Sequence, residues 1–153
     1  MASGFPAGES SSRGDANVTV LVVEDDIVDQ EIVQRSFKRA KLSHPLIFAE
    51  NGFEALKIMR GEHPKTKIQG PYMVLLDLNM PVMDGFEVLE EMRSDRELRD
   101  KVVFVLSTSD DEGDVKRAYS RGISGYIQKG DISEGFSEAT KMLSSFSNVV
   151  IMP

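Results

Sequence analysis

Acidic residues, hydroxyl residues and one lysine follow short apolar runs at several points of the chain. An acidic run at 24–26 follows VTVLVV, and Asp77 follows VLL. Ser107 follows KVVFVL, and Lys129 follows GYIQ. If these side chains met, the crowded carboxylates would repel one another unless a cation lay among them, and such oxygen ligands suit Mg²⁺. One carboxylate could then attack phosphorus and form an acyl phosphate, while a lysine and a hydroxyl stabilise the transferring group.

Each of these residues also has an ordinary explanation when it is taken alone. Asp77 could be a turn or helix-capping residue, and the run at 24–26 could be the acidic first turn of a helix. The hydroxyl residues at 107–109 could form a polar loop, and Lys129 could be a solvated surface charge. These separate explanations do not account for four such groups in this order, each at the end of an apolar run. The joint pattern therefore favours a phosphoryl-transfer site.

The elements that would position these residues follow from the hydrophobic pattern. Apolar, β-branched runs predict strands at 18–23, 45–50, 72–78, 101–107 and 124–128. The segments between them show helical periodicity, and the last two predicted helices place inward Val115, Ala118 and Tyr119, then Phe136, Ala139 and Leu143. Five strand-then-helix units predict an α/β fold: a doubly wound, five-stranded parallel sheet with five helices on its two faces. Ligands of such folds bind at the carboxyl ends of the strands, where the polar residues fall.

Composition excludes several other kinds of site. The chain has no cysteine and two histidines, which excludes disulfides, thiolate metal sites and multi-histidine metal sites. The net charge of -7 argues against nucleic acid as a partner, because an acidic domain repels phosphate backbones. The sequence shows neither an apolar run of membrane-spanning length nor a signal peptide. We therefore expect a cytoplasmic protein that does not bind membranes.

The ends of the chain differ from its middle. Residues 1–17 are rich in Gly, Ser and Ala and predict a disordered tail before a domain at 18–145. The segment 146–153 is an apolar tail that either folds back onto the domain or docks on a second subunit. An output domain would not fit there. The signal is therefore expected to pass by protein–protein contact with an effector or by phosphotransfer to a downstream protein.

The chain resembles the receiver-domain family of two-component response regulators. The resemblance runs from about residue 18 to 145 and is carried by VLVVEDD, VLLDLNMPVMDGFEVL, VVFVLSTS and GYIQK. The stretch DLNMPVMDG is the most specific of these motifs. The resemblance implies a phosphoprotein of a phosphorelay, which accepts a phosphoryl group from a sensor histidine kinase on Asp77. Such a domain catalyses its own phosphorylation and dephosphorylation and is not a metabolic enzyme.

The resemblance also implies roles for individual residues. Mg²⁺ would be held by Glu24, Asp25, Asp77 and the backbone carbonyl of Asn79. Lys129 would pair with the phosphoryl group. Ser107 would bind a phosphoryl oxygen, and Tyr126 would change position between the two states of the switch.

Two features narrow the resemblance. The family usually has proline after the lysine, whereas Gly130 follows Lys129 here, so the loop after Lys129 departs from the family pattern. The long segment GEHPKTKIQGPY and the ending FSNVVIMP resemble single-domain regulators partnered with phytochrome-type histidine kinases. This narrower resemblance implies a light-sensing kinase partner and a homodimer.

Two other functions stay open at this point. The first is a receiver-like binding module that works without phosphate, which the Gly130 departure motivates. The second is an aspartyl-phosphate phosphatase with turnover. Such phosphatases usually need a second aspartate two residues after the nucleophile, and Asn79 occupies that position.

Overall fold

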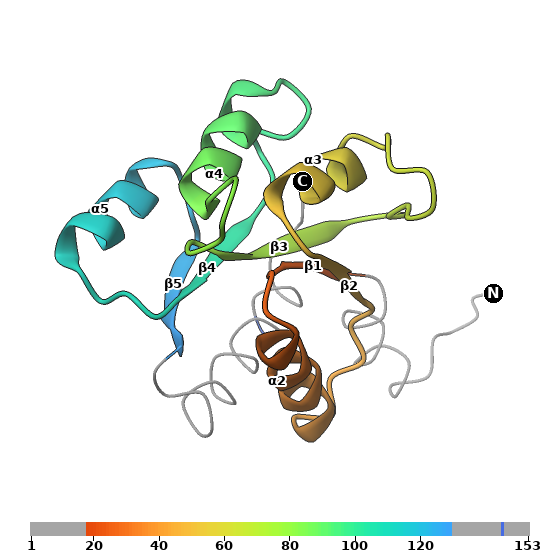
Figure 1. The fold of residues 1–153 in the computed structure, drawn as a ribbon. Helices are drawn as coiled ribbons and strands as arrows, with labels where there is room; N and C mark the ends of the chain where they lie inside the picture. The colour runs from red at the N-terminus through yellow and green to blue at the C-terminus, as the bar shows by residue number, and fades with distance from the viewer. Residues whose placement is uncertain (1–17, 130–144, 146–153) are drawn as a thin grey trace.

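The computed structural model describes residues 18–129 and residue 145, and its centre is one parallel sheet (Figure 1). The strands are β1 (Thr19–Val23), β2 (Leu46–Ala49), β3 (Tyr72–Asp77), β4 (Val103–Ser107) and β5 (Gly125–Gln128). All neighbouring strands pair in parallel, in the order β2-β1-β3-β4-β5. The predicted five-stranded parallel sheet is confirmed.

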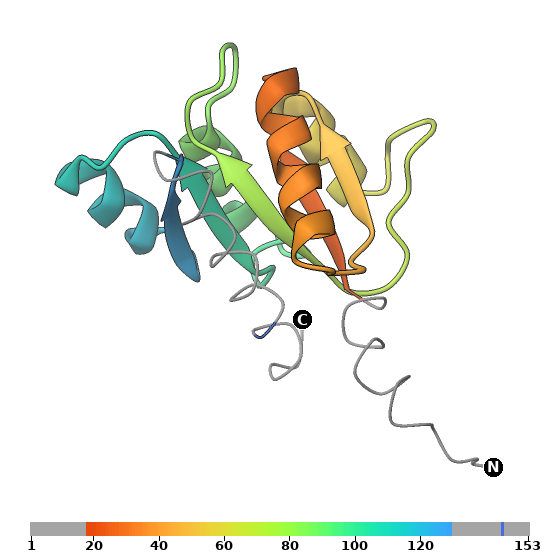
Figure 2. The same ribbon diagram turned by 90° about the horizontal axis from the view of Figure 1, so that it is seen from below.

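Helices cover both faces of this sheet. The helix α2 (Ile27–Arg39) lies on one face, and α3 (Gly52–Met59), α4 (Gly85–Ser94) and α5 (Glu112–Ser120) lie on the other (Figures 1 and 2). Two hydrophobic cores result, one against α2 around Val20, Val22 and Phe37, and one against the other helices around Leu21 and Leu89. Because successive strand residues point to opposite faces, β1 is buried along its whole length, which explains its unbroken apolar sequence.

Some predictions fall on residues that the structure does not describe. They are the fifth helix, with Phe136, Ala139 and Leu143, and the two tails at 1–17 and 146–153. Among the helices described, none has the length and apolar character needed to cross a membrane.

Side-chain caps fix the points where the helices begin, just after the strand ends. Asp26 caps α2, Asn51 caps α3, and Asp111 caps α5. Asp84 and Glu87 form a capping box at the start of α4. Each cap satisfies backbone N–H groups of the first helical turn. The loops between the strand ends and the helices are therefore held in place.

The helix α5 differs from the prediction in what it buries. The periodicity placed Tyr119 inward, but Tyr119 is 49% exposed. Within α5, all of which the structure describes, Ala118 alone is buried. Charged groups hold this helix to α4 instead: Arg117 lies 4.0 Å from the centroid of the Phe86 ring, and Arg121 at the end of α5 pairs with Glu90 at 2.7 Å.

Candidate functional site

The strand register brings the predicted site residues to one edge of the sheet. Glu24 and Asp77 lie side by side, one position beyond the last backbone pair that involves β1. Asp77 pairs with the residue before Ser107, and Ser107 pairs with the residue before Lys129. Since all strands run in the same direction, their carboxyl ends meet there. The structure therefore brings these side chains to the same edge of the sheet, and their chemical roles remain predictions.

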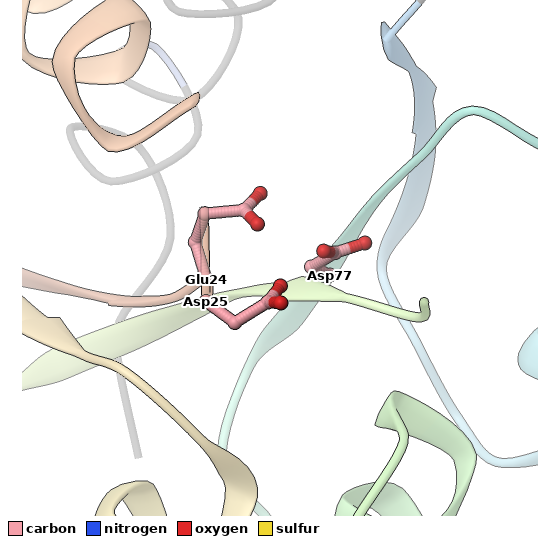
Figure 3. Close-up of side chains that lie close together, drawn as sticks. All are labelled: Glu24, Asp25 and Asp77. Carbon is pink, nitrogen blue, oxygen red and sulfur yellow. The ribbon is translucent and has the colours of Figure 1, made fainter. Parts of the chain in front are cut away.

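Three carboxylates form an acidic cluster at this edge (Figure 3). Oxygen atoms of Glu24, Asp25 and Asp77 all lie within 4.8 Å of one another. Glu24 and Asp77 are buried, with 1% and 3% of their surface exposed, whereas Asp25 faces solvent. Carboxylate oxygens are hard ligands that fit a divalent cation such as Mg²⁺, and a cation would offset the repulsion between these groups. The cluster therefore fits the cation that the sequence predicts.

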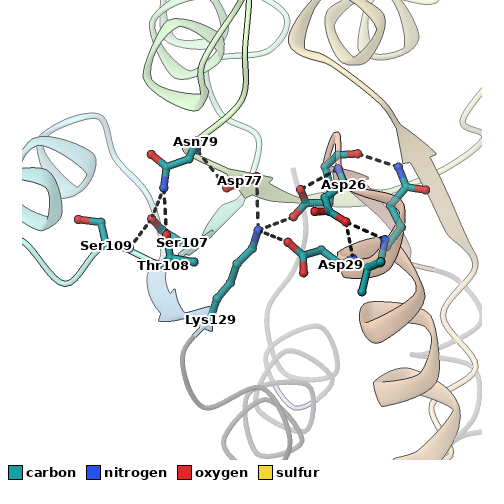
Figure 4. A network of polar contacts seen from close by, with 11 residues as sticks. Asp26, Asp29, Asp77, Asn79, Ser107, Thr108, Ser109 and Lys129 are labelled. Atoms are coloured by element: carbon teal, nitrogen blue, oxygen red, sulfur yellow. Dashed lines mark hydrogen bonds and ion pairs between the residues drawn. The ribbon is translucent and has the colours of Figure 1, made fainter.

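The buried ammonium group of Lys129 lies among the carboxylates (Figure 4). Its Nζ is 2.7 Å from Glu24 Oε1, 2.8 Å from Asp29 Oδ2 and 3.4 Å from Asp77 Oδ2. Burial lowers the pKa of Lys129, but hydrogen bonds to Asp29 and Glu24 and the charge of Asp77 outweigh it, so that the pKa rises overall. The ammonium therefore stays charged at neutral pH and attracts anionic groups at the end of β3.

The carboxyl group of Glu24 has a strongly raised pKa. Burial raises the pKa of Glu24 to about 8, and the neighbouring Asp77 adds to this rise, while Lys129 opposes it. Its backbone and side chain are both held: Gln30 Nε2 donates to Glu24 O at 2.7 Å, and Asp26 N donates to Glu24 Oε2 at 3.2 Å. A bound cation would favour the ionised form of this carboxyl group.

The loop after Asp77 is fixed by backbone contacts. Asn79 N donates to Asp77 Oδ1 at 3.0 Å, and Gly85 N donates to the carbonyl oxygen of Leu78 at 3.0 Å. A Cβ atom at Gly85 would lie 2.5 Å from the carbonyl oxygen of Asp77 and 2.7 Å from Leu78 Cα. A glycine is therefore required where α4 begins, because the helix comes this close to the end of β3.

The predicted switch residues are linked through Ser109. Ser107 is completely buried, and its Oγ accepts a hydrogen bond from Ser109 N at 3.1 Å. Tyr126 is half-buried, and its hydroxyl donates to the carbonyl oxygen of Ser109 at 2.9 Å. The amide of Asn79 reaches Ser107 Oγ and Thr108 Oγ1, both at 3.4 Å. A displacement of Ser107 would therefore shift the backbone of Ser109, and through it the hydrogen bond of Tyr126.

Two acidic residues near the cluster differ from what the sequence indicated. Asp26 belongs to the acidic run, but its side chain caps α2 by accepting from Val28 N at 2.8 Å, so the ordinary explanation holds for it. Asp29 was not predicted, although it makes one of the shortest contacts to Lys129. The sequence feature that could have indicated Asp29 is its position in the first turn of a predicted helix, three residues after the acidic run at 24–26. The loop that begins at Gly130 lies outside the described residues.

Comparisons with known proteins place this arrangement in a family. The model of the response regulator receiver domain matches residues 20–138. The chain is 34% identical over 110 residues to the response regulator Rcp1 of Synechocystis sp., an alignment that covers 72% of this chain and 75% of Rcp1. The Mn²⁺-bound structure of Rcp1 has a TM-score of 0.77 at 31% identity, and it covers 90% of this chain and 99% of the other.

A second solved structure is the phosphorylated cyanobacterial phytochrome response regulator RcpA. It has a TM-score of 0.78 at 31% identity and covers 90% of this chain and 99% of RcpA. The family match spans well over half of the chain, and its range includes Glu24, Asp25, Asp77 and Lys129. The chain therefore belongs to the response regulator receiver domain family of two-component systems, a class of signalling proteins that are not conventional enzymes.

Proposed function

We propose that the chain works as a single-domain response regulator that accepts a phosphoryl group from a sensor histidine kinase on Asp77. The observation that supports this most is the position of the Asp77 carboxylate. It is 3% exposed, it lies beside two other carboxylates, and its Oδ2 is 3.4 Å from the ammonium group of Lys129. A role as a turn cap does not explain why Asp77 lies beside a buried ammonium group and two other carboxylates.

The residues present suit attack of a carboxylate on phosphorus. An oxygen of Asp77 would form a bond to phosphorus while the bond from phosphorus to the imidazole nitrogen of the donor breaks. Lys129 would neutralise negative charge on the phosphoryl group, since its ammonium already lies at the end of β3. The Ser107 hydroxyl, at the end of the neighbouring strand β4, would donate a hydrogen bond to a phosphoryl oxygen.

We assign the acidic cluster to Mg²⁺. Glu24, Asp25 and Asp77, with the backbone carbonyl of Asn79, would hold the ion. The bound ion supplies positive charge that offsets the crowded carboxylates and the charge of the phosphoryl group. Two findings support the assignment: the ligand atoms of the cluster are carboxylate oxygens, and the related Rcp1 has been solved with Mn²⁺ bound.

The proposed kinase partner is of the phytochrome type. This part of the proposal rests on the similarity to RcpA, which is described as a phytochrome response regulator. The phosphorylated state would be passed on by contact with an effector protein or by further phosphotransfer, after Ser107 and Tyr126 rearrange. The loop of β4 is suited to this, because Ser109 contacts both residues.

Phosphotransfer from a purified phytochrome-type histidine kinase tests the proposal. The kinase is first autophosphorylated with labelled ATP, and label is then followed into the wild type, Asp77→Asn and Asp100→Asn. The control, Asp100→Asn, makes the same substitution at an exposed aspartate. Asp100 precedes β4 and so lies at the opposite end of the strands from Asp77. We expect labelling of the wild type and the control but not of Asp77→Asn. Equal labelling of Asp77→Asn would refute Asp77 as the acceptor, and transfer from unrelated kinases alone would refute the phytochrome-type partner.

The proposed homodimer needs a separate test. Light scattering over a concentration series, on the full chain and on a chain without residues 146–153, would show whether the apolar tail joins two subunits. We expect a dimer of the full chain and a shift toward monomer for the shortened chain. A monomer in both cases would refute the dimer.

A further inference from the structure

The ammonium group of Lys129 is shared among three carboxylates, and its two shortest contacts are not with the proposed phosphoacceptor. Its Nζ lies 2.7 Å from Glu24 and 2.8 Å from Asp29, compared with 3.4 Å from Asp77 (Figure 4). Asp29 accepts a hydrogen bond from this ammonium group, and Glu24 and Asp77 form ion pairs with it. Any new anion at Asp77 must therefore compete for Lys129 with partners that are already in place.

Asp29 is held in position to make this contact. It is the third residue of α2, and Asp26 Oδ1 accepts from its backbone N at 3.3 Å. Its side chain is 25% exposed, and that of Lys129 is 6% exposed, so the pair is largely removed from water. An acidic residue in a first helical turn is favourable in any helix. That general preference does not explain why this carboxylate faces a buried lysine 100 positions further along the chain.

We propose that Asp29 is a positioning residue that keeps Lys129 beside Asp77 in the resting state and competes with the incoming phosphoryl group for its ammonium. This inference rests on the proposed function, because it concerns the same site. Asp29 adds a third carboxylate beside Lys129, which already contacts two members of the acidic cluster, Glu24 and Asp77. Its negative charge repels an anionic group at Asp77, and its hydrogen bond occupies a donor that the group would use.

The substitution Asp29→Asn separates the two parts of this role. Asparagine keeps an oxygen that can accept a hydrogen bond from Lys129, but it removes the charge. Lys129 should then stay near Asp77 while its attraction for an anion increases. Glu31→Gln is the matched control. It also neutralises one carboxylate of α2, but Glu31 is exposed and pairs with Arg35 at 3.8 Å on the same helix.

Titration calorimetry with beryllofluoride, a phosphoryl mimic, at a Mg²⁺ concentration that saturates each variant tests the inference. We expect Asp29→Asn to bind about threefold to tenfold more tightly than the wild type, and Glu31→Gln to match the wild type. A merely structural role for Asp29 cannot produce tighter binding, since loss of structure weakens the site. Binding by Asp29→Asn that equals or is weaker than that of the wild type would overturn the role of Asp29 alone. Failure of the wild type to bind beryllofluoride would overturn this role and the proposed function together.

Discussion

Replacing Gly85 with alanine should push α4 away from the end of β3. The new Cβ would lie 2.5 Å from the carbonyl oxygen of Asp77, whereas real Cβ contacts essentially never fall below 3.0 Å, so the two must separate by at least 0.5 Å. The two nearest atoms, Asp77 O and Leu78 Cα, are backbone atoms, and β3 is paired with β1 and β4. The helix must therefore move, which loosens the packing of Leu89 and Met92. Such overpacking costs about 1–3 kcal/mol.

Two readouts test this prediction. Urea unfolding should show the loss in the free energy of unfolding, and the rate of Asp77 phosphorylation by acetyl phosphate should fall, because the loop at Asn79 moves with Gly85. Gly113→Ala is the control, since the nearest atom that its Cβ would meet is a side-chain oxygen, Asp111 Oδ1, at 3.0 Å. A Gly85→Ala variant with wild-type stability and a wild-type rate would refute the reasoning.

Two further predictions concern the acid cluster and the switch. Burial raises the pKa of Glu24 from 4.5 to about 8, so Mg²⁺ must displace a proton below pH 8. Calorimetry should show about tenfold tighter Mg²⁺ binding at pH 7 than at pH 6, and about fiftyfold tighter binding at pH 8 than at pH 6. In the metal-free protein the effect of pH on stability has the opposite sign. The folded state holds the proton of Glu24 more tightly than the unfolded state does. The stability that protonated Glu24 contributes is therefore complete below pH 4.5 and is lost as the pH rises through 8. A Mg²⁺ affinity and a free energy of unfolding that both stay constant over this range would contradict the raised pKa of Glu24. Tyr126→Phe removes the hydrogen bond to Ser109 O, which should lower the free energy of unfolding by about 0.5–1.5 kcal/mol without preventing phosphorylation of Asp77. Unchanged stability in urea would show that this bond contributes nothing.

Much of the fold could be predicted because the strands are buried on both faces. The residues of β1, β3 and β4 are all buried, so each strand appears in the sequence as an unbroken apolar run. The polar residues at the ends of these runs could then be assigned to one edge of the sheet. Asp77, Ser107 and Lys129 follow from that rule, since parallel strands all end at the same edge.

Other features depend on contacts that no local pattern contains. The contact between Asp29 and Lys129 requires the first turn of α2 to face the end of β5, 100 positions away. The exposure of Tyr119 has a similar cause. Helical periodicity favoured burial, but α5 rests on α4 through the contact of Arg117 with the Phe86 ring and buries little apolar surface of its own. The placement of each helix against its neighbours, rather than helical periodicity, determines the Asp29–Lys129 contact and the exposure of Tyr119.

The central claim is that Asp77 accepts a phosphoryl group. Intact-mass spectrometry after incubation with Mg²⁺ and acetyl phosphate, on the wild type and on Asp77→Asn, tests it most directly. We predict that the wild type gains the mass of one phosphoryl group and that Asp77→Asn gains none. A wild type that stays unmodified, or a variant that gains the same mass, would contradict the claim.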